Sequence, residues 1–307
     1  MKRKTQKIKT HFTHIVHIHF LIVFLAFSFI CSGCQSTKGL ENQTKFIEEV
    51  EINACDTVFE IFDTTFEDDF QEDEKFIFLR LYLPNYKNKL SGVNILKALI
   101  ASSEPSDYDF SHSAIGFDLN DTFYGLTRYR PQDLKMESCT NPGTNKYMKK
   151  CDKYKSVQLT LALKVSKEEY ENTKNFVERD FDQAKVKYDT PQNLPIGFWG
   201  YKRKRQKPET ARNFGGIPSK KGFVDPSEEK KFKFVCSSYV AYVLASNVQE
   251  VRDFFIEKKV DYHYVIPTDL IFFPGVQSLF VSTWEDYEIA AGELVKSQPI
   301  FAEYFSP

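Results

Sequence analysis

The chain has 307 residues, of which 42% are hydrophobic and 15% aromatic, so it contains ample apolar material for a folded core. Its formal net charge is −1, and five basic residues lie within the first nine positions, which leaves the remainder more acidic. This balance does not provide the basic surface that general nucleic-acid binding requires, and we expect no nucleic-acid partner.

The first 34 residues have the pattern of an export signal. A basic start is followed by an apolar stretch over 20–30 and then by Cys31-Ser-Gly-Cys34. A short apolar region that ends in small residues is typical of secretory signals. Small residues directly before a cysteine also resemble a bacterial lipobox, in which Cys34 would receive a diacylglycerol. We therefore expect a lipoprotein anchored to a bacterial membrane on its extracytoplasmic side, in the cell envelope. The alternatives are an uncleaved membrane-spanning helix and plain secretion.

Residues 35–75 are rich in acidic side chains and are expected to form a tether that leads into a folded domain over 76–275. The β-rich run 76–83 predicts a strand, and 94–101 suits a short helix. A further strand is expected to carry His112. A hairpin turn over 118–122 should then lead into the next strand.

The alternating stretch 157–165 predicts a central strand of the sheet. Ser166 and Glu169 match a capping box, so a helix should begin there and run to about Lys185. Cys139 and Cys151 flank a loop upstream of this strand. Outside the cytoplasm they could form a disulfide, and the alternative is two unrelated thiols.

Residues 191–232 form a basic insert with two lysine-rich patches. One interpretation is a solvated excursion, and the other is an electrostatic contact with anionic lipid or cell-wall polymer. Residues 276–307 are expected to be a C-terminal extension that packs on the domain.

Cys236 stands at the start of an apolar run that predicts an amphipathic helix. The free N–H groups and the dipole at a helix N-terminus stabilise a thiolate, and the same N–H groups can donate to an oxyanion. A nearby imidazole could take the thiol proton and later protonate a leaving group. The alternative is a buried structural cysteine.

Only two histidines lie outside the first 34 residues, His112 and His263. The more economical pairing for Cys236 is His112. His263 is the rival base, because it follows Cys236 in papain-like order, and its alternative is an outward position on a strand. Asp118 is interpreted as a turn residue, and Asp269 as a helix cap or turn residue.

Three motifs occur in an order that resembles a known family: Phe110-Ser-His-Ser-Ala-Ile115, Phe234-Val-Cys-Ser-Ser-Tyr-Val-Ala241 and Ile266-Pro-Thr-Asp-Leu270. They are similar to the circularly permuted papain-fold hydrolases, the NlpC-type cell-wall peptidase superfamily in its YiiX-like branch. The resemblance implies an α+β fold with a small antiparallel sheet packed against helices. It also implies that Cys236 is the nucleophile and His112 the general base and acid.

The family's third site position departs from the pattern. Its members usually carry an acidic or histidine side chain on the strand after the base strand, and the matching stretch 123–127 holds no carboxylate. Tyr124 is the candidate orienting residue, with Thr127 as the alternative, although neither stabilises an imidazolium as a carboxylate does.

The expected function is an exported thiol hydrolase that cleaves an amide bond, with cell-wall peptides as the favoured substrates. Lipid or acyl-amide substrates, cleaved or transferred at the membrane, are the second possibility. The missing carboxylate favours a third, a catalytically decayed binding module of the same fold, and a tethered structural envelope protein is a fourth. We expect no cofactor and no metal, because no Cys/His grouping has zinc-ligand spacing.

Overall fold

The computed structural model describes residues 73–82, 110, 112–120, 122–126, 137–138, 158–182, 185–189, 223–282 and 287–305. Several sequence predictions lie outside these residues. They are the export signal with Cys34, the helix over 94–101, the pair Cys139 and Cys151, and most of the basic insert.

The centre of the fold is a six-stranded sheet in the order β4-β3-β2-β1-β5-β8, in which every neighbouring pair is antiparallel. A second, two-stranded parallel sheet joins β6 and β7. The strands are β1 (Glu74–Tyr82), β2 (His112–Gly116), β3 (Thr122–Tyr124), β4 (Glu137–Ser138), β5 (Gln158–Ser166), β6 (Lys187–Tyr188), β7 (Lys233–Phe234) and β8 (Val276–Ser282).

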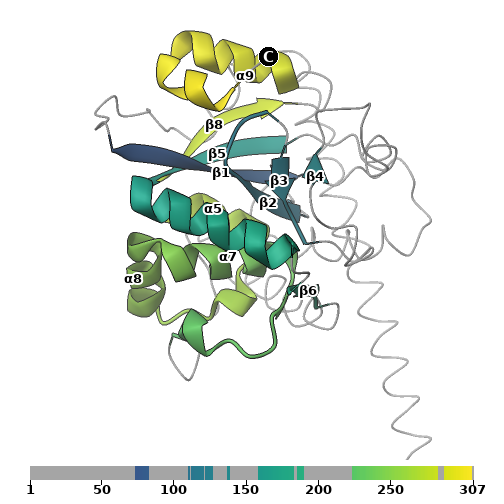
Figure 1. Ribbon diagram of the computed structural model, residues 1–307, viewed down its shortest axis with the longest axis vertical. Coiled ribbons are helices and arrows are strands. Elements are labelled where there is room, and N and C mark those ends of the chain that lie inside the picture. Colours follow the sequence, from purple (N-terminus) through teal and green to yellow (C-terminus); the bar gives the residue numbers. More distant parts are fainter. Residues whose placement is uncertain are drawn as a thin grey trace, which may run out of the picture.

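Helices cover both faces of the large sheet, as Figure 1 shows. The α9 segment and the 3-10 helix η6 lie on one face, and α5, α7 and α8 lie on the other. The helices are α5 (Lys167–Asp182), η3 (Pro226–Glu228), α7 (Cys236–Asn247), α8 (Gln249–Lys258), η4 (Tyr262–Tyr264), η5 (Pro267–Phe272), α9 (Tyr287–Ser297) and η6 (Pro299–Tyr304). The fold is therefore α+β, with a small antiparallel sheet packed against helices, as the sequence predicts.

Strand β1 is apolar along most of its length because both of its faces are covered. Phe76 and Phe78 pack against Phe301 and Tyr304 of η6, with ring centroids 5.0–6.2 Å apart. The alternate side chains, such as Leu79, point to the α5 side and are fully buried. The predicted strand over 76–83 is confirmed, and it begins two residues earlier.

Helix α5 begins at the predicted capping box. The Ser166 hydroxyl accepts from the Glu169 N–H at 3.3 Å, and the Glu169 carboxylate accepts from the Ser166 N–H at 3.0 Å. One stripe of the helix, which includes Tyr170, Val177 and Phe181, is buried. The helix ends at Asp182, three residues before the predicted end.

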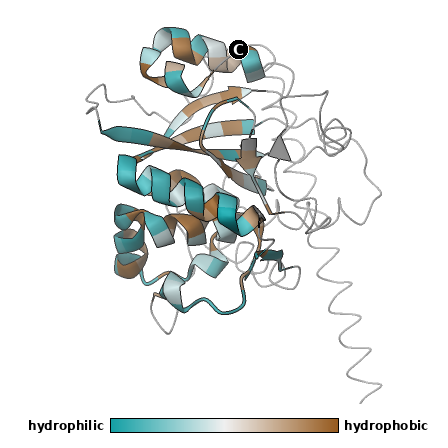
Figure 2. Cartoon of the chain, in the orientation of Figure 1, coloured by the Kyte–Doolittle hydropathy of each residue, from teal (hydrophilic) through white to brown (hydrophobic). Residues whose placement is uncertain are grey.

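Helix α7 begins at Cys236 as predicted, but it is not amphipathic. Every residue from Cys236 to Ala245 is buried, because α5, α8, β2 and η4 all pack around this helix. A helix that is apolar on all sides belongs in the interior. In Figure 2 α7 is mostly brown, whereas the visible face of α5 is mostly teal.

The C-terminal part of the basic insert is folded onto the body of the protein. Pro226 of η3 is buried, and Asp225 caps η3 and forms an ion pair with Arg252 of α8. Residues 223–232 therefore combine a folded turn with exposed side chains, such as Ser227, Lys230 and Lys231. The physical reason is local, because an Asp N-cap followed by proline starts a helical turn and brings apolar residues inward.

Residues 276–307 contribute to both the sheet and its cover. The strand β8 pairs with β5, and α9 and η6 pack over the sheet face beyond it. The Tyr287 hydroxyl donates to the carbonyl of Leu119 at 2.7 Å and so ties α9 to the turn after β2.

Replacement of Gly116 by alanine is expected to destabilise the protein by about 1–3 kcal/mol. A Cβ atom at this position would lie 2.8 Å from the Phe123 ring, which is fully buried. The Arg80 guanidinium covers the ring at 3.7 Å from its centroid, so the ring has little room to retreat. The free energy of unfolding, measured in denaturant, checks this prediction.

Gly292 of α9 provides the matched control, because a Cβ there would come no closer than 3.9 Å to the side chain of Phe305. Gly292→Ala should therefore stabilise the protein by about 0.5–1 kcal/mol. If the two variants were equally stable, the tight packing assigned to Gly116 would be contradicted.

Candidate functional site

Cys236 is the first residue of α7, and two serines fix the turn around it. The Ser238 hydroxyl accepts from the N–H of Val235 at 2.9 Å and contacts the Val235 carbonyl at 3.2 Å. The Ser237 hydroxyl donates to the carbonyl of Val265 at 2.7 Å, which joins this turn to the chain after η4. The cysteine itself is buried, with 4% of its surface exposed.

His112 is the first residue of β2, beside the N-terminus of α7. It lies directly across from Tyr82 of β1, and the two rings are 5.4 Å apart. Within the described residues β3 pairs with β2 only at Ile115 and Gly116, so it does not extend alongside His112 and Ser113.

The side chains of His112 and Cys236 are in contact through a hydrogen bond. The backbone N–H groups of Ser113 and Ser237 also donate to the sulfur. Burial alone raises the pKa of the Cys236 thiol. The charge of the His112 ring, its hydrogen bond and the two backbone donors outweigh burial and hold the pKa below its ordinary value.

This arrangement makes the Cys236 thiol more acidic and places an imidazole beside it. The sulfur lies at the N1 position of a helix, where the dipole and the free N–H groups stabilise negative charge. A thiolate is the nucleophilic form of cysteine, and an adjacent imidazolium can give its proton to a leaving group. Two residues 124 positions apart in the chain therefore supply the two groups that covalent acyl transfer requires.

The structure places Tyr124, the candidate orienting residue, in an aromatic cluster. Tyr124 pairs with Ile115, three residues along β2 from His112. Its ring packs against Phe117 and Phe181, at 6.3 and 5.2 Å. The role of Tyr124 as the orienting residue stays a prediction. Thr127 lies outside the described residues.

A row of polar residues crosses the sheet beside His112, and the sequence analysis did not single it out. His112, Tyr82, Gln158 and Ser282 occupy successive paired positions on β2, β1, β5 and β8. The Gln158 amide donates to the Ser282 hydroxyl at 3.3 Å, and both residues are fully buried. The sequence feature that could have revealed this row is the presence of two polar residues, Gln158 and Thr160, in the largely apolar stretch 157–165.

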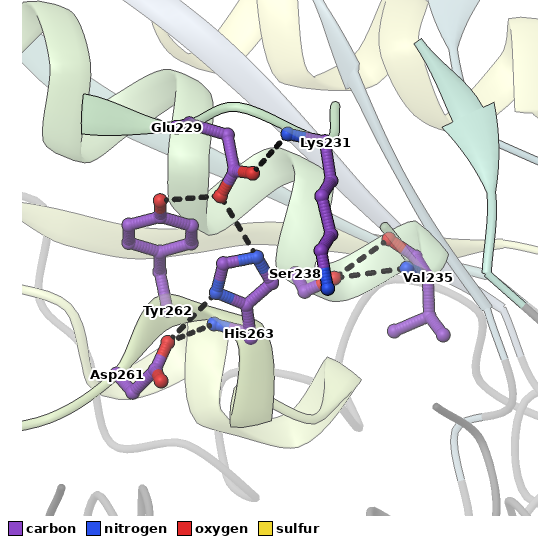
Figure 3. Close-up of polar contacts among 7 residues, drawn as sticks. All are labelled: Glu229, Lys231, Val235, Ser238, Asp261, Tyr262 and His263. Carbon is purple, nitrogen blue, oxygen red and sulfur yellow. Dashed lines mark hydrogen bonds and ion pairs between the residues drawn. The ribbon is translucent and has the colours of Figure 1, made fainter. Parts of the chain in front are cut away.

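His263 lies in η4 rather than on a strand, and both of its ring nitrogens are engaged by carboxylates. Nδ1 lies 2.9 Å from Asp261 Oδ1, and Nε2 lies 3.0 Å from Glu229 Oε2 (Figure 3). The hydrogen-bond partner of Cys236 is His112. The geometry therefore gives no support to His263 as the rival base.

The turn and cap interpretations of two aspartates are confirmed. Asp118 accepts from the Asn120 N–H at 2.9 Å, within the turn that follows β2. Asp269 accepts from the Ile266 N–H at 3.2 Å and so caps η5.

A buried carboxylate lies behind the candidate site, where α5 packs on α7. Asp180 and Tyr239 are both fully buried. The Asp180 carboxylate interacts electrostatically with the Tyr239 hydroxyl, but neither group forms a hydrogen bond of normal length and angle. Burial raises the pKa of Asp180, although Lys185 and Arg179 oppose the shift. An acid whose pKa is higher in the folded state than in the unfolded state destabilises the folded state. The destabilisation develops as the pH rises from the pKa of the unfolded state through the pKa of the folded state.

We therefore expect Asp180→Asn to raise the free energy of unfolding by about 1 kcal/mol at neutral pH. The gain should shrink toward about pH 3, below the ordinary Asp pKa of about 3.9, where the carboxyl is largely protonated in both states. Denaturant unfolding of both proteins at the two pH values measures this difference. A gain that is equal at both pH values would contradict the assigned cause.

Within the described residues, no group of three or more His, Cys, Asp or Glu side chains is placed to hold a metal ion. The helices among these residues include none of the length and apolarity needed to cross a membrane. Comparison of the chain with protein-family models, with curated proteins and with solved structures finds no match.

Proposed function

We propose that the chain is a thiol hydrolase in which Cys236 is the nucleophile and His112 is the general base and acid. The observation that carries the proposal is the contact between these two side chains at the N-terminus of α7. The lowered pKa of Cys236 supports it, because a buried structural cysteine would have a raised pKa.

In the proposed reaction the Cys236 thiolate attacks the carbonyl carbon of an amide, and the carbonyl oxygen becomes an oxyanion. Backbone N–H groups of the first turn of α7 would donate to this oxyanion. The His112 imidazolium gives its proton to the departing amine, and a thioester to Cys236 is left behind. Water then attacks the thioester while His112 takes the water proton, which releases a carboxylic acid and restores the thiolate–imidazolium pair.

We also propose the permuted papain-like arrangement and a cell-wall peptide as substrate. The support is the order of the three motifs in the chain and the export pattern before Cys34. The architecture is of the kind that this proposal needs, with the cysteine at a helix N-terminus and the histidine on a strand of an antiparallel sheet. Acyl-amide or ester substrates at the membrane form the second candidate, which the lipobox-like Cys34 favours.

The test is turnover by the full chain in detergent with two substrate panels, muropeptides from purified peptidoglycan and long-chain acyl amides or esters. We expect the wild-type protein to hydrolyse members of one panel, and Cys236→Ala and His112→Ala to hydrolyse neither. The reacting panel identifies the substrate class. Equal turnover by the wild-type protein and Cys236→Ala would refute the proposal. Binding of either panel without turnover would favour the decayed binding module instead.

A further inference from the structure

We propose that His263 is a positioning residue for Cys236. Its side chain forms a latch with Glu229 and Asp261, and this latch holds the segment that leads into α7. The latch consists of the side chains of His263, Glu229 and Asp261. The proposal rests on the proposed function in so far as it assumes a reactive Cys236.

The latch joins two parts of the chain that are far apart in sequence. His263 Nδ1 lies 2.9 Å from Asp261 Oδ1 within η4, and Nε2 lies 3.0 Å from Glu229 Oε2, just after η3 (Figure 3). The two carboxylates therefore flank the ring, one beside each ring nitrogen.

The carboxylate of Glu229 is almost buried, with 7% of the side chain exposed, so it depends on its partners. The Tyr262 hydroxyl donates to it at 2.9 Å, and the Lys231 N–H donates at 2.8 Å (Figure 3). Burial raises the pKa of Glu229. The Lys231 and Tyr262 hydrogen bonds and the charge of His263 outweigh it and hold the pKa below its usual value.

The same imidazole packs against the chain two residues before the nucleophile. The Phe234 ring stacks on His263 with centroids 5.6 Å apart, and Tyr262 stacks on His263 at 4.5 Å. Val265, which follows η4, accepts the hydrogen bond from Ser237. Segment 229–235 and the first turn of α7 are therefore both attached to the η4 region, one through the latch and the other through Ser237.

This attachment matters because the sulfur of Cys236 must meet three donors at once. His112 and Ser113 belong to β2, whereas Ser237 belongs to α7, so their common approach to the sulfur depends on where the helix begins. We infer that release of the latch lets segment 229–235 shift and weakens these contacts, which raises the pKa of Cys236.

Two substitutions separate positioning from simple charge effects. His263→Gln removes a positive charge near the site, and Glu229→Gln removes a negative one. Through-space charge alone would shift the Cys236 pKa upward in the first variant and downward in the second. Loss of positioning shifts it upward in both. The double variant should resemble either single variant, because the two groups act as one unit.

The measurement is the rate of alkylation of Cys236 against pH in the full chain, read by mass spectrometry of the labelled peptide. We expect each variant to react about tenfold more slowly than wild type near pH 6, which corresponds to a rise of about one unit in pKa. Tyr304→Phe is the stability control, because it alters the Tyr304–Phe76 hydrogen bond on the opposite face of the sheet. It should lower the melting temperature and leave the alkylation profile unchanged.

Opposite shifts in the two single variants, or no shift in either, would overturn the latch while the wild-type profile still shows a reactive thiol. A wild-type profile that rises only in the range of an ordinary cysteine would overturn the proposed function itself. A shifted profile in Tyr304→Phe would also overturn the latch, because stability alone would then explain the effect.

Discussion

Replacement of His112 by alanine should slow the alkylation of Cys236 near pH 6 by about 100-fold. The ring supplies both the neighbouring charge and a hydrogen bond to the sulfur, and these are the largest effects that oppose burial. Without the ring, burial dominates and the thiol becomes more weakly acidic than an ordinary cysteine. The thiolate fraction near pH 6 then falls by orders of magnitude, and the rate falls with it.

The rate is measured in the full chain with a small alkylating reagent, and the melting temperature of each variant is recorded in parallel. Tyr304→Phe again serves as a folded variant with a perturbation away from the sulfur. The assignment of His112 would be contradicted if the alanine variant were folded and reacted as fast as wild type at this pH.

Phe234→Ala is expected to cause the largest loss of stability, about 3–5 kcal/mol. The ring is fully buried, stacks on Tyr242 with centroids 4.6 Å apart, and also contacts Tyr239, Tyr262 and His263. Its removal leaves a cavity where α7, β7 and η4 meet, and the surrounding rings cannot all move to fill it.

Unfolding in denaturant gives the free energy for the wild-type protein, Phe234→Ala and the more conservative Phe234→Leu. Leucine keeps much of the buried volume and should lose less stability than alanine. A loss below about 1 kcal/mol for the alanine variant would mean that this aromatic cluster is not tightly packed.

The elements that the sequence predicts correctly are those with a strong local signal. The alternating run of β5 and the Ser166–Glu169 capping box depend on neighbours a few residues away, and both are confirmed. The start of α7 at Cys236 is confirmed for the same reason. Its burial on every side was missed, because that depends on α5, α8 and η4 packing around it.

The features that the sequence analysis missed depend on contacts between distant segments. The latch requires Glu229 to meet His263 across 34 positions, and Glu229 stands in a lysine-rich stretch that looks solvated when taken alone. The polar row of Tyr82, Gln158 and Ser282 beside His112 depends on strand register, which composition does not reveal. Sequence position favours Tyr124 as the orienting residue, and its ring contacts depend on Phe117 and Phe181, which are brought together by the packing of α5 on the sheet.

The small number of histidines predicts the pairing of His112 with Cys236, and the structure brings the two side chains into contact. Their roles in a reaction are the proposal that this contact supports.

The most direct test of the central claim is the pKa of Cys236 in the full chain. The difference in thiolate absorbance between the wild-type protein and Cys236→Ser, followed across pH, isolates this one sulfur from the other cysteines. We predict a midpoint clearly below the ordinary thiol value of about 8.5 in the wild-type protein and a midpoint above that value in His112→Ala. A wild-type midpoint at or above about 8.5, or one that does not change when His112 is removed, would contradict this prediction.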